Sequence, residues 1–142
     1  MKYLLDSDHL SLLQRKKSPE RAMIVANINL HGELNSFACV ASLHEQMLGA
    51  HNKIQQAKNA EDLFKGYRLI DTLLESYSGF EVLSFDHDAI TEFFRLKSLN
   101  LRINKLDLRI ASIALSRSMT VVTRKLSDFG RVPNLKIENW TQ

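Results

Sequence analysis

The sequence has little cysteine, proline and glycine, and it contains no long apolar run. The single cysteine, Cys39, excludes an internal disulfide framework and a cysteine-rich zinc site, and it fits a reducing cytoplasm. No stretch of about 18 apolar residues is present, and acids at Asp6 and Asp8 break the apolar run near the start. We therefore expect a soluble, cytoplasmic protein without a membrane span or a secretory signal.

The remaining composition is that of a folded globular protein. Of the 142 residues, 44% are hydrophobic and 25% charged, while 2 prolines and 5 glycines exclude a collagen-like or low-complexity chain. No internal repeat or linker interrupts the sequence, so we expect a single domain over residues 1–142. Lysine and arginine number 19 against 16 acids, and this mild excess of positive charge is compatible with a polyanionic partner.

Short apolar strands alternate with helical segments along the whole chain. We predict strands over 3–5, 36–40, 80–85, 119–123 and, as a short fifth one, 136–138. Helices are predicted over 8–15, from Pro19 to Gly32, from Ser42 onward, over 63–77 and 86–99, and after Asp107. This alternation predicts an α/β fold with an open, mostly parallel sheet of 4–5 strands flanked by helices.

Two of the predicted helices carry aromatic residues at helical spacing. In the helix over 63–77 the apolar face is expected to pack in the core, with the docking of a protein partner as the alternative. In the helix over 86–99, Phe93 and Phe94 are expected to be core residues, and Trp140 is expected to anchor the last strand by packing.

Three acids stand close to the ends of predicted strands. Asp6 ends the first strand, Glu45 lies one turn into the helix after the second, and Asp107 lies at the start of the helix before the fourth. In an open parallel sheet, ligands bind beyond the carboxyl ends of the strands, where the strand order reverses. Carboxylates brought together there repel one another, whereas a hard divalent cation removes the repulsion and accepts oxygen ligands. This pattern suggests a Mg²⁺ or Mn²⁺ site.

Each of these acids also has a purely structural interpretation. Ser42-x-x-Glu45 has the spacing of a helix capping box, and Asn104-x-x-Asp107 has a similar form. Either Asp6 or Asp8 is suited to cap the first helix. Spacing alone leaves metal binding and capping both open.

Four short motifs, in order along the chain, resemble those of PIN domains. They are YLLDSDHL over 3–10, VASLHE over 40–45, LDLRIA over 106–111, and VVTR over 121–124 followed by Asp128-Phe129. The final RVPNL and ENW segments are similar to those of VapC-type toxins in particular. The resemblance covers essentially the whole chain, and it implies a Mg²⁺-dependent ribonuclease that is the toxin of a toxin–antitoxin pair.

The resemblance also assigns roles to individual residues. It implies that Asp6, Glu45 and Asp107 are the catalytic, metal-binding acids, and that Ser7 and Thr123 support them. The implied reaction is hydrolysis of RNA phosphodiester bonds by a metal-activated water, leaving a 5′-phosphate and a 3′-hydroxyl. The implied partners are the RNA substrate, a small antitoxin and a second copy of the chain.

One position departs from the family pattern. The second residue after Thr123 is usually Asp or Asn, whereas here it is Lys125. A lysine there is expected to weaken binding of a second metal and to contact a phosphate. Further candidates around the site are Asp8 and Asp128 as supporting acids, and Lys105, Arg124 and Lys125 as RNA-binding cations.

Two alternatives to the nuclease are compatible with parts of the sequence. The first is a degenerate PIN domain that binds RNA or a protein but has lost turnover because of Lys125. The second is a haloacid-dehalogenase-like phosphatase, because Asp6-x-Asp8 after an apolar strand resembles the opening motif of those enzymes. The phosphatase is disfavoured because the Asp-Gly-Thr continuation is missing and Glu45 and Asp107 would have no role. The five histidines show no metal-ligand spacing, and for His9 a side-chain hydrogen bond or a surface position is expected rather than ligation.

Overall fold

The computed structural model describes residues 1–142, and its centre is a five-stranded sheet in which every pairing is parallel. The strand order is β3-β2-β1-β4-β5. The strands are β1 (Tyr3–Leu5), β2 (Ser36–Cys39), β3 (Glu81–Leu83), β4 (Thr120–Val122) and β5 (Ile137–Glu138). All five lie where the sequence predicts strands, so the expected parallel α/β sheet is confirmed, including its short fifth strand.

Seven helices and one 3₁₀ turn connect the strands. The helices are α1 (Ser7–Gln14), α2 (Pro19–His31), α3 (Val40–Gln55), α4 (Ala60–Ser78), α5 (His87–Lys97), α6 (Lys105–Ser116) and α7 (Leu126–Phe129), and the turn spans Glu33–Asn35. Several begin at a side chain that accepts a hydrogen bond from the N–H three residues on, as Ser18, Asn59 and Asp86 do. The short α7 is an element that the sequence did not predict.

Alternating residues of the strands point to two separate cores. Leu4 and Val121 pack on one face of the sheet with residues of α5, α6 and α7. Leu5 and Val122 pack on the other face with residues of α1, α2, α3 and α4. Successive strand residues point to opposite faces of the sheet. Because helices cover both faces, residues pointing either way are buried, and most strand residues are therefore apolar. Trp140 is buried in the second core, as predicted.

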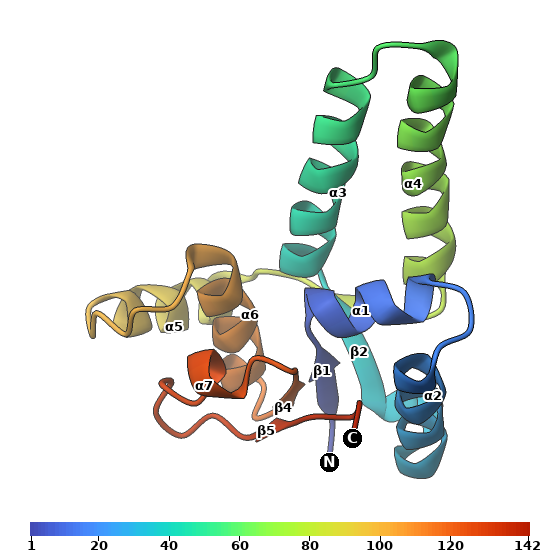
Figure 1. Cartoon of the computed structure of the whole chain (residues 1–142). Helices are drawn as coiled ribbons and strands as arrows, with labels where there is room; N and C mark the ends of the chain where they lie inside the picture. The colour runs from blue at the N-terminus through green and yellow to red at the C-terminus, as the bar shows by residue number, and fades with distance from the viewer.

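Successive strands are added first on one side of β1 and then on its other side. The chain runs from β1 to β2 and β3 through α1–α4 on one face, and it then crosses back to β4 through α5 and α6 on the other face (Figure 1). Right-handed crossovers require helices on opposite faces when the direction of strand addition changes. The switch point therefore lies between the carboxyl ends of β1 and β4, where Asp6 and Thr123 follow the strands.

Helices α3 and α4 form a hairpin that rises beyond the sheet edge at which β2 ends (Figure 1). The apolar face predicted for α4 consists of Leu63, Tyr67, Ile70, Leu74 and Tyr77. Tyr77 is buried as the sequence predicts, and Leu73, which is not part of that predicted face, is buried as well. Leu74 is 69% exposed, and in the outer part of the hairpin Leu63 is 44% and Tyr67 56% exposed. The prediction of a fully packed face is thus wrong for most of α4, because the hairpin leaves the layer that would cover it.

The aromatic residues of α5 divide in the same way. Phe93 is buried, whereas Phe94 is 60% exposed and its ring forms a T-shaped pair with that of Phe93, with the centroids 5.4 Å apart. The prediction that both are core residues is therefore wrong for Phe94. No helix combines the length and apolar composition needed to cross a bilayer.

Candidate metal-binding site

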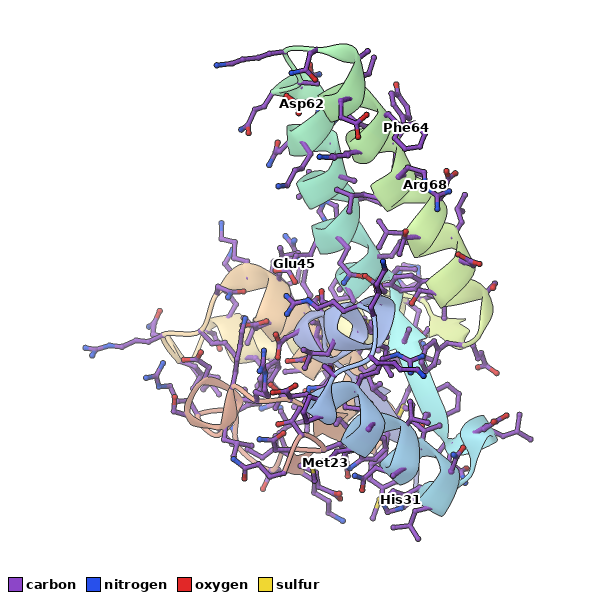
Figure 2. The ribbon with its side chains drawn as sticks, turned by 45° about the vertical axis from the view of Figure 1, so that its right-hand side comes forward. Met23, His31, Glu45, Asp62, Phe64 and Arg68 are labelled. Atoms are coloured by element: carbon purple, nitrogen blue, oxygen red, sulfur yellow. The ribbon has the colours of Figure 1, made fainter.

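The three predicted acids meet in one polar pocket beyond the carboxyl ends of the strands. The pocket has a volume of about 300 Å³ and no hydrophobic lining residue. Its lining consists of Asp6, Ser7, Asp8, Ser11, Glu45, Gln46, Asp107 and Lys125. Figure 2 shows Glu45 at the base of α3, where this helix contacts α1 and α6. Residues more than a hundred positions apart in the sequence are therefore brought together at the switch point of the sheet.

Asp6 is held rigidly where β1 ends and α1 begins. Its backbone N–H donates to the carbonyl of Val122 at 3.0 Å, which extends the pairing of β1 with β4. Its Oδ1 accepts a hydrogen bond from the N–H of His9 at 2.9 Å, so Asp6 is the N-cap of α1. The capping interpretation is correct for Asp6 and wrong for Asp8. Because capping uses Oδ1, the second carboxylate oxygen of the buried Asp6 stays available to a ligand.

His9 lies behind Asp6 and is completely buried. Its Nε2 accepts the backbone N–H of Trp140 at 3.3 Å, so neutral His9 carries its proton on Nδ1. That nitrogen lies 3.4 Å from Oδ1 of Asp6. Nδ1 nevertheless has no hydrogen-bond partner. The bond from Trp140 to Nε2 confirms the expected side-chain hydrogen bond, and the burial of His9 contradicts the surface position. Asp6, Asp8 and His9 together offer ligand atoms within 4.8 Å of one another.

Asp107 is placed by the first turn of α6. Asn104 is the N-cap, with its Oδ1 accepting the N–H of Asp107 at 2.8 Å and its Nδ2 donating to Oδ2 of Asp107 at 2.9 Å. The ammonium of Lys125 donates to the same Oδ2 at 3.1 Å. The helix cap is made by Asn104, so Asp107 lines the pocket without having to cap the helix itself. The capping and metal-binding interpretations are therefore compatible here.

Glu45 has no structural partner. The structure begins α3 at Val40 rather than near Ser42, because Cys39 is the residue with extended backbone at the helix start. Ser42 is consequently inside the helix, where its hydroxyl lies 3.7 Å from Sγ of Cys39. The capping-box interpretation of Ser42 and Glu45 is wrong. No hydrogen bond or ion pair involves the Glu45 carboxylate, which leaves both of its oxygens for a ligand.

The electrostatics of the pocket favour a bound cation. Burial raises the pKa of Asp107, the hydrogen bond from Lys125 opposes this, and the nearby Glu45 and Asp6 carboxylates raise it further. For Lys125, burial lowers the pKa, but the hydrogen bond and charge of Asp107 and the other acids outweigh it and raise the pKa. One ammonium thus faces three clustered carboxylates, and a divalent cation would relieve their remaining repulsion.

A buried serine adds a second observation that points to a ligand. Ser7 is one of the residues that line the pocket, and its buried hydroxyl has no hydrogen-bond partner. Buried polar atoms are nearly always paired with protein or with a bound molecule. Asp6, Glu45 and Asp107 line the same pocket as Ser7, and their carboxylate oxygens are donors of the kind that Mg²⁺ and Mn²⁺ accept.

The three predicted RNA-binding cations differ in their ion pairs and in their exposure. Arg124 forms a two-pronged ion pair with Asp8, with Nε–Oδ2 at 2.6 Å and Nη2–Oδ1 at 2.7 Å. This hydrogen bond lowers the pKa of Asp8. Lys105, at the first position of α6, is exposed and forms no ion pair. Lys125 is 40% exposed although it contacts Asp107, so its ammonium is reachable from the pocket mouth.

The two remaining supporting candidates lie outside the lining of the pocket. The hydroxyl of the buried Thr123 accepts the N–H of Lys125 at 2.8 Å and so fixes the start of the loop that carries the lysine. Asp128 belongs to α7 and pairs with Arg131 at 3.3 Å. The structure thus connects Thr123 to the site through Lys125, and it does not bring Asp128 to the acids as the sequence-based assignment requires.

Gln46 and Ser11 also line the pocket, although neither is predicted from the sequence. Ser7, Ser11 and Gln14 recur at helical spacing, and this polar face of α1 is a signal from which Ser11 could have been predicted. For Gln46 the only local signal is its position directly after Glu45.

Comparison with known proteins gives relatives of one kind. No family model matches the chain. It is 27% identical over 147 residues to the tRNA(fMet)-specific endonuclease VapC of Salmonella typhimurium, covering 99% of this chain and 98% of that protein. It is 44% identical over 45 residues to Ribonuclease VapC2 of Rickettsia felis, covering 32% of this chain and 34% of that protein.

Solved structures agree in fold. DNA-bound VapBC from Salmonella typhimurium has a TM-score of 0.76 at 24% identity, covering 99% of this chain and 98% of that one. VapBC2 from Rickettsia felis bound to a fragment of promoter DNA has a TM-score of 0.74 at 24% identity, covering 99% of both chains. At this identity the likeness shows a shared fold, and it extends over nearly the whole length of each chain.

Proposed function

We propose that this chain, a PIN-domain protein related to the VapC ribonucleases, is a divalent-metal-dependent endoribonuclease and the toxin of a toxin–antitoxin pair. The observation that carries the proposal is the presence of Asp6, Glu45 and Asp107 in the lining of one pocket that no hydrophobic residue lines. Single carboxylates at strand ends are common, but three that converge from distant segments need a shared ligand to offset their repulsion.

We assign the metal to Asp6, Glu45 and Asp107, with Mg²⁺ as the proposed ion and Mn²⁺ as its substitute. Bound there, the metal would supply a water or hydroxide of lowered pKa and would neutralise charge on a phosphoryl oxygen. Ser7 would donate its free hydroxyl to a ligand-bound oxygen. The cap at Asp6 and the Asn104 hydrogen bond hold the two buried carboxylates in fixed orientations, which limits the reorganisation that binding requires.

Lys125 has a separate proposed role. Its ammonium is hydrogen-bonded to Asp107 yet 40% exposed, so it can turn toward a phosphate at the pocket mouth. Lys105 would add a phosphate contact outside the pocket lining, because it is an exposed cation without an ion pair in the first turn of α6. Arg124 is the weakest of the three candidates, since Asp8 already takes both prongs of its guanidinium fork.

The proposed substrate and partners follow from the relatives. One is named a tRNA-specific endonuclease, and the solved neighbours are VapBC complexes, some bound to DNA. We extend an RNA substrate, a small antitoxin and a homodimer to this chain as proposals, with action in the cytoplasm. The exposed Phe64, Tyr67 and Leu74 of α4 supply an apolar surface for the antitoxin, since such groups are otherwise costly to leave in water.

The alternative function is that of a PIN domain without turnover, which binds RNA or a protein. The observation that favours it is the ion pair of Lys125 with Asp107, because an ammonium there occupies an oxygen that a metal would use. Divalent-metal titration of the purified protein, together with RNA cleavage, separates the two. The nuclease binds Mn²⁺ and cleaves, whereas the binding module retains its partner without cleaving in any metal.

A further inference from the structure

One side-chain amide connects three helices beside the acid pocket. Gln46 follows Glu45 on α3 and is half-buried against α1 and α4. Its nitrogen donates to the carbonyl of Ser7 at 3.2 Å and to the hydroxyl of Ser11 at 2.8 Å. Its oxygen accepts from the hydroxyl of Tyr77 at 2.8 Å. Both ends of the amide are therefore used.

A second amide reinforces this arrangement. Gln14, at the end of α1, donates from its Nε2 to Oε1 of Gln46 at 3.1 Å. The same nitrogen lies 3.3 Å from the hydroxyl of Ser76 on α4. The amide of Gln46 is thus oriented by donors on two helices, and its nitrogen is aimed at the start of α1.

Only an amide satisfies this set of partners. A glutamate at position 46 would present two acceptors to the Ser7 carbonyl, which is itself an acceptor. An apolar residue would leave the buried Tyr77 hydroxyl and part of α1 without partners. The requirement for a donor on one side and an acceptor on the other indicates a specific role for Gln46.

The partners of Gln46 are adjacent to the acids. Ser7 immediately follows Asp6, and Gln46 immediately follows Glu45, so the bond from Gln46 to the Ser7 carbonyl joins the backbone beside one acid to the residue beside the other. Glu45 has no hydrogen bond of its own. We infer that Gln46 is a positioning residue that sets the separation of Asp6 and Glu45, with Tyr77 fixing the orientation of its amide. This role rests on the proposed metal site.

The test compares metal affinity in matched variants of the full chain. Mn²⁺ binding is measured by calorimetric titration for the wild type, Gln46→Leu and Tyr77→Phe, and thermal unfolding is followed in parallel. Gln55→Leu is the control, because it removes an exposed amide of α3 whose contact is with His51 rather than with α1. Changes of residues that support metal ligands typically weaken affinity about 10- to 100-fold.

We expect Gln46→Leu to weaken Mn²⁺ binding by about tenfold. Tyr77→Phe keeps the ring in the core and removes only the hydroxyl, so we expect a loss of about two- to fivefold, the size of a single hydrogen bond. The Gln55→Leu variant is expected to bind Mn²⁺ as the wild type does. Tyr77→Phe also provides the test if Gln46→Leu does not fold.

Failure of the positioning role is distinguishable from failure of the metal site. Unchanged Mn²⁺ affinity in folded Gln46→Leu, or in Tyr77→Phe when the first variant is unfolded, overturns the positioning role while leaving the metal site in place. A lower melting temperature without a change in affinity also overturns it, since the amide would then be a purely structural tie. A wild type that binds no Mn²⁺ overturns the metal site and the positioning role together.

Discussion

Removing the positive charge of Lys125 is expected to tighten divalent-metal binding. The ammonium lies 3.1 Å from Oδ2 of Asp107, and a metal that takes this oxygen must displace it. Two unit charges about 4 Å apart interact by about 1 kcal/mol in water and about 4 kcal/mol near a protein surface. Because the lysine side chain is 40% exposed, we take the interaction energy of Lys125 with Asp107 to lie at the lower end of this range, at about 1–2 kcal/mol. Lys125→Met should therefore lower the Kd for Mn²⁺ by about five- to thirtyfold.

Calorimetric titration with Mn²⁺ measures this change directly. The matched control is Lys105→Met, which removes an exposed lysine of α6 that forms no ion pair. Its affinity for Mn²⁺ should stay within about twofold of the wild type, because an exposed charge is screened by solvent. Lys125→Asp should tighten binding beyond Lys125→Met, since it replaces the ammonium beside Asp107 with a further oxygen ligand.

Competition between the ammonium and the metal is ruled out if Lys125→Met binds Mn²⁺ with the affinity of the wild type or more weakly. Either result would mean that the metal sits elsewhere in the pocket or uses the lysine indirectly. If Lys105→Met lowered the Kd for Mn²⁺ as much as Lys125→Met does, the net charge of the protein, rather than the contact with Asp107, would govern affinity.

Two further predictions concern stability. Arg124→Met should lower the free energy of unfolding in urea by about 0.5–1 kcal/mol near neutral pH. Because Arg124 lowers the pKa of Asp8, this contribution is present above the ordinary carboxyl pKa and is lost as the pH falls through the lowered one, so a difference that persists in strong acid would contradict it. Gly66→Ala should destabilise by about 1–3 kcal/mol, because a Cβ there would lie 2.7 Å from Cγ1 of Ile54. By contrast, Gly49→Ala, with nothing within 4 Å, should gain up to about 1 kcal/mol in helix propensity, and thermal melts showing the reverse order would argue against this packing.

The parts of the fold that follow local rules were predictable from the sequence. Short segments rich in apolar residues predicted four strands, a fifth was predicted over 136–138, and the alternation of strands with helices predicted the parallel sheet. From the sheet follows the meeting of Asp6 and Asp107, because Asp6 follows β1 and the helix that leads back into the parallel strand β4 begins at the edge where the strands end. The short α7 was missed since a single turn leaves no periodicity to detect.

Features that depend on how helices pack could not be predicted. The exposure of Leu63 and Tyr67 arises because α3 and α4 extend past the sheet, and an amphipathic pattern is the same whether or not a neighbour covers it. The hydrogen bonds of Gln46 join α1, α3 and α4, so they depend on the spacing of three helices rather than on any one segment. The start of α3 at Val40 was misjudged because an apolar strand runs directly into an apolar first turn.

Hydrolysis of RNA by a divalent metal in the acid pocket is tested by incubating total RNA with the purified protein. The reactions contain Mg²⁺ or Mn²⁺, EDTA in place of the metal, or the Asp6→Asn variant. Asparagine caps helices as well as aspartate does, so this variant removes a carboxylate while retaining the start of α1. We predict discrete fragments with the wild type that disappear with EDTA and with Asp6→Asn. Cleavage that persists in Asp6→Asn, or no cleavage by a wild type that binds metal, would contradict the proposed mechanism.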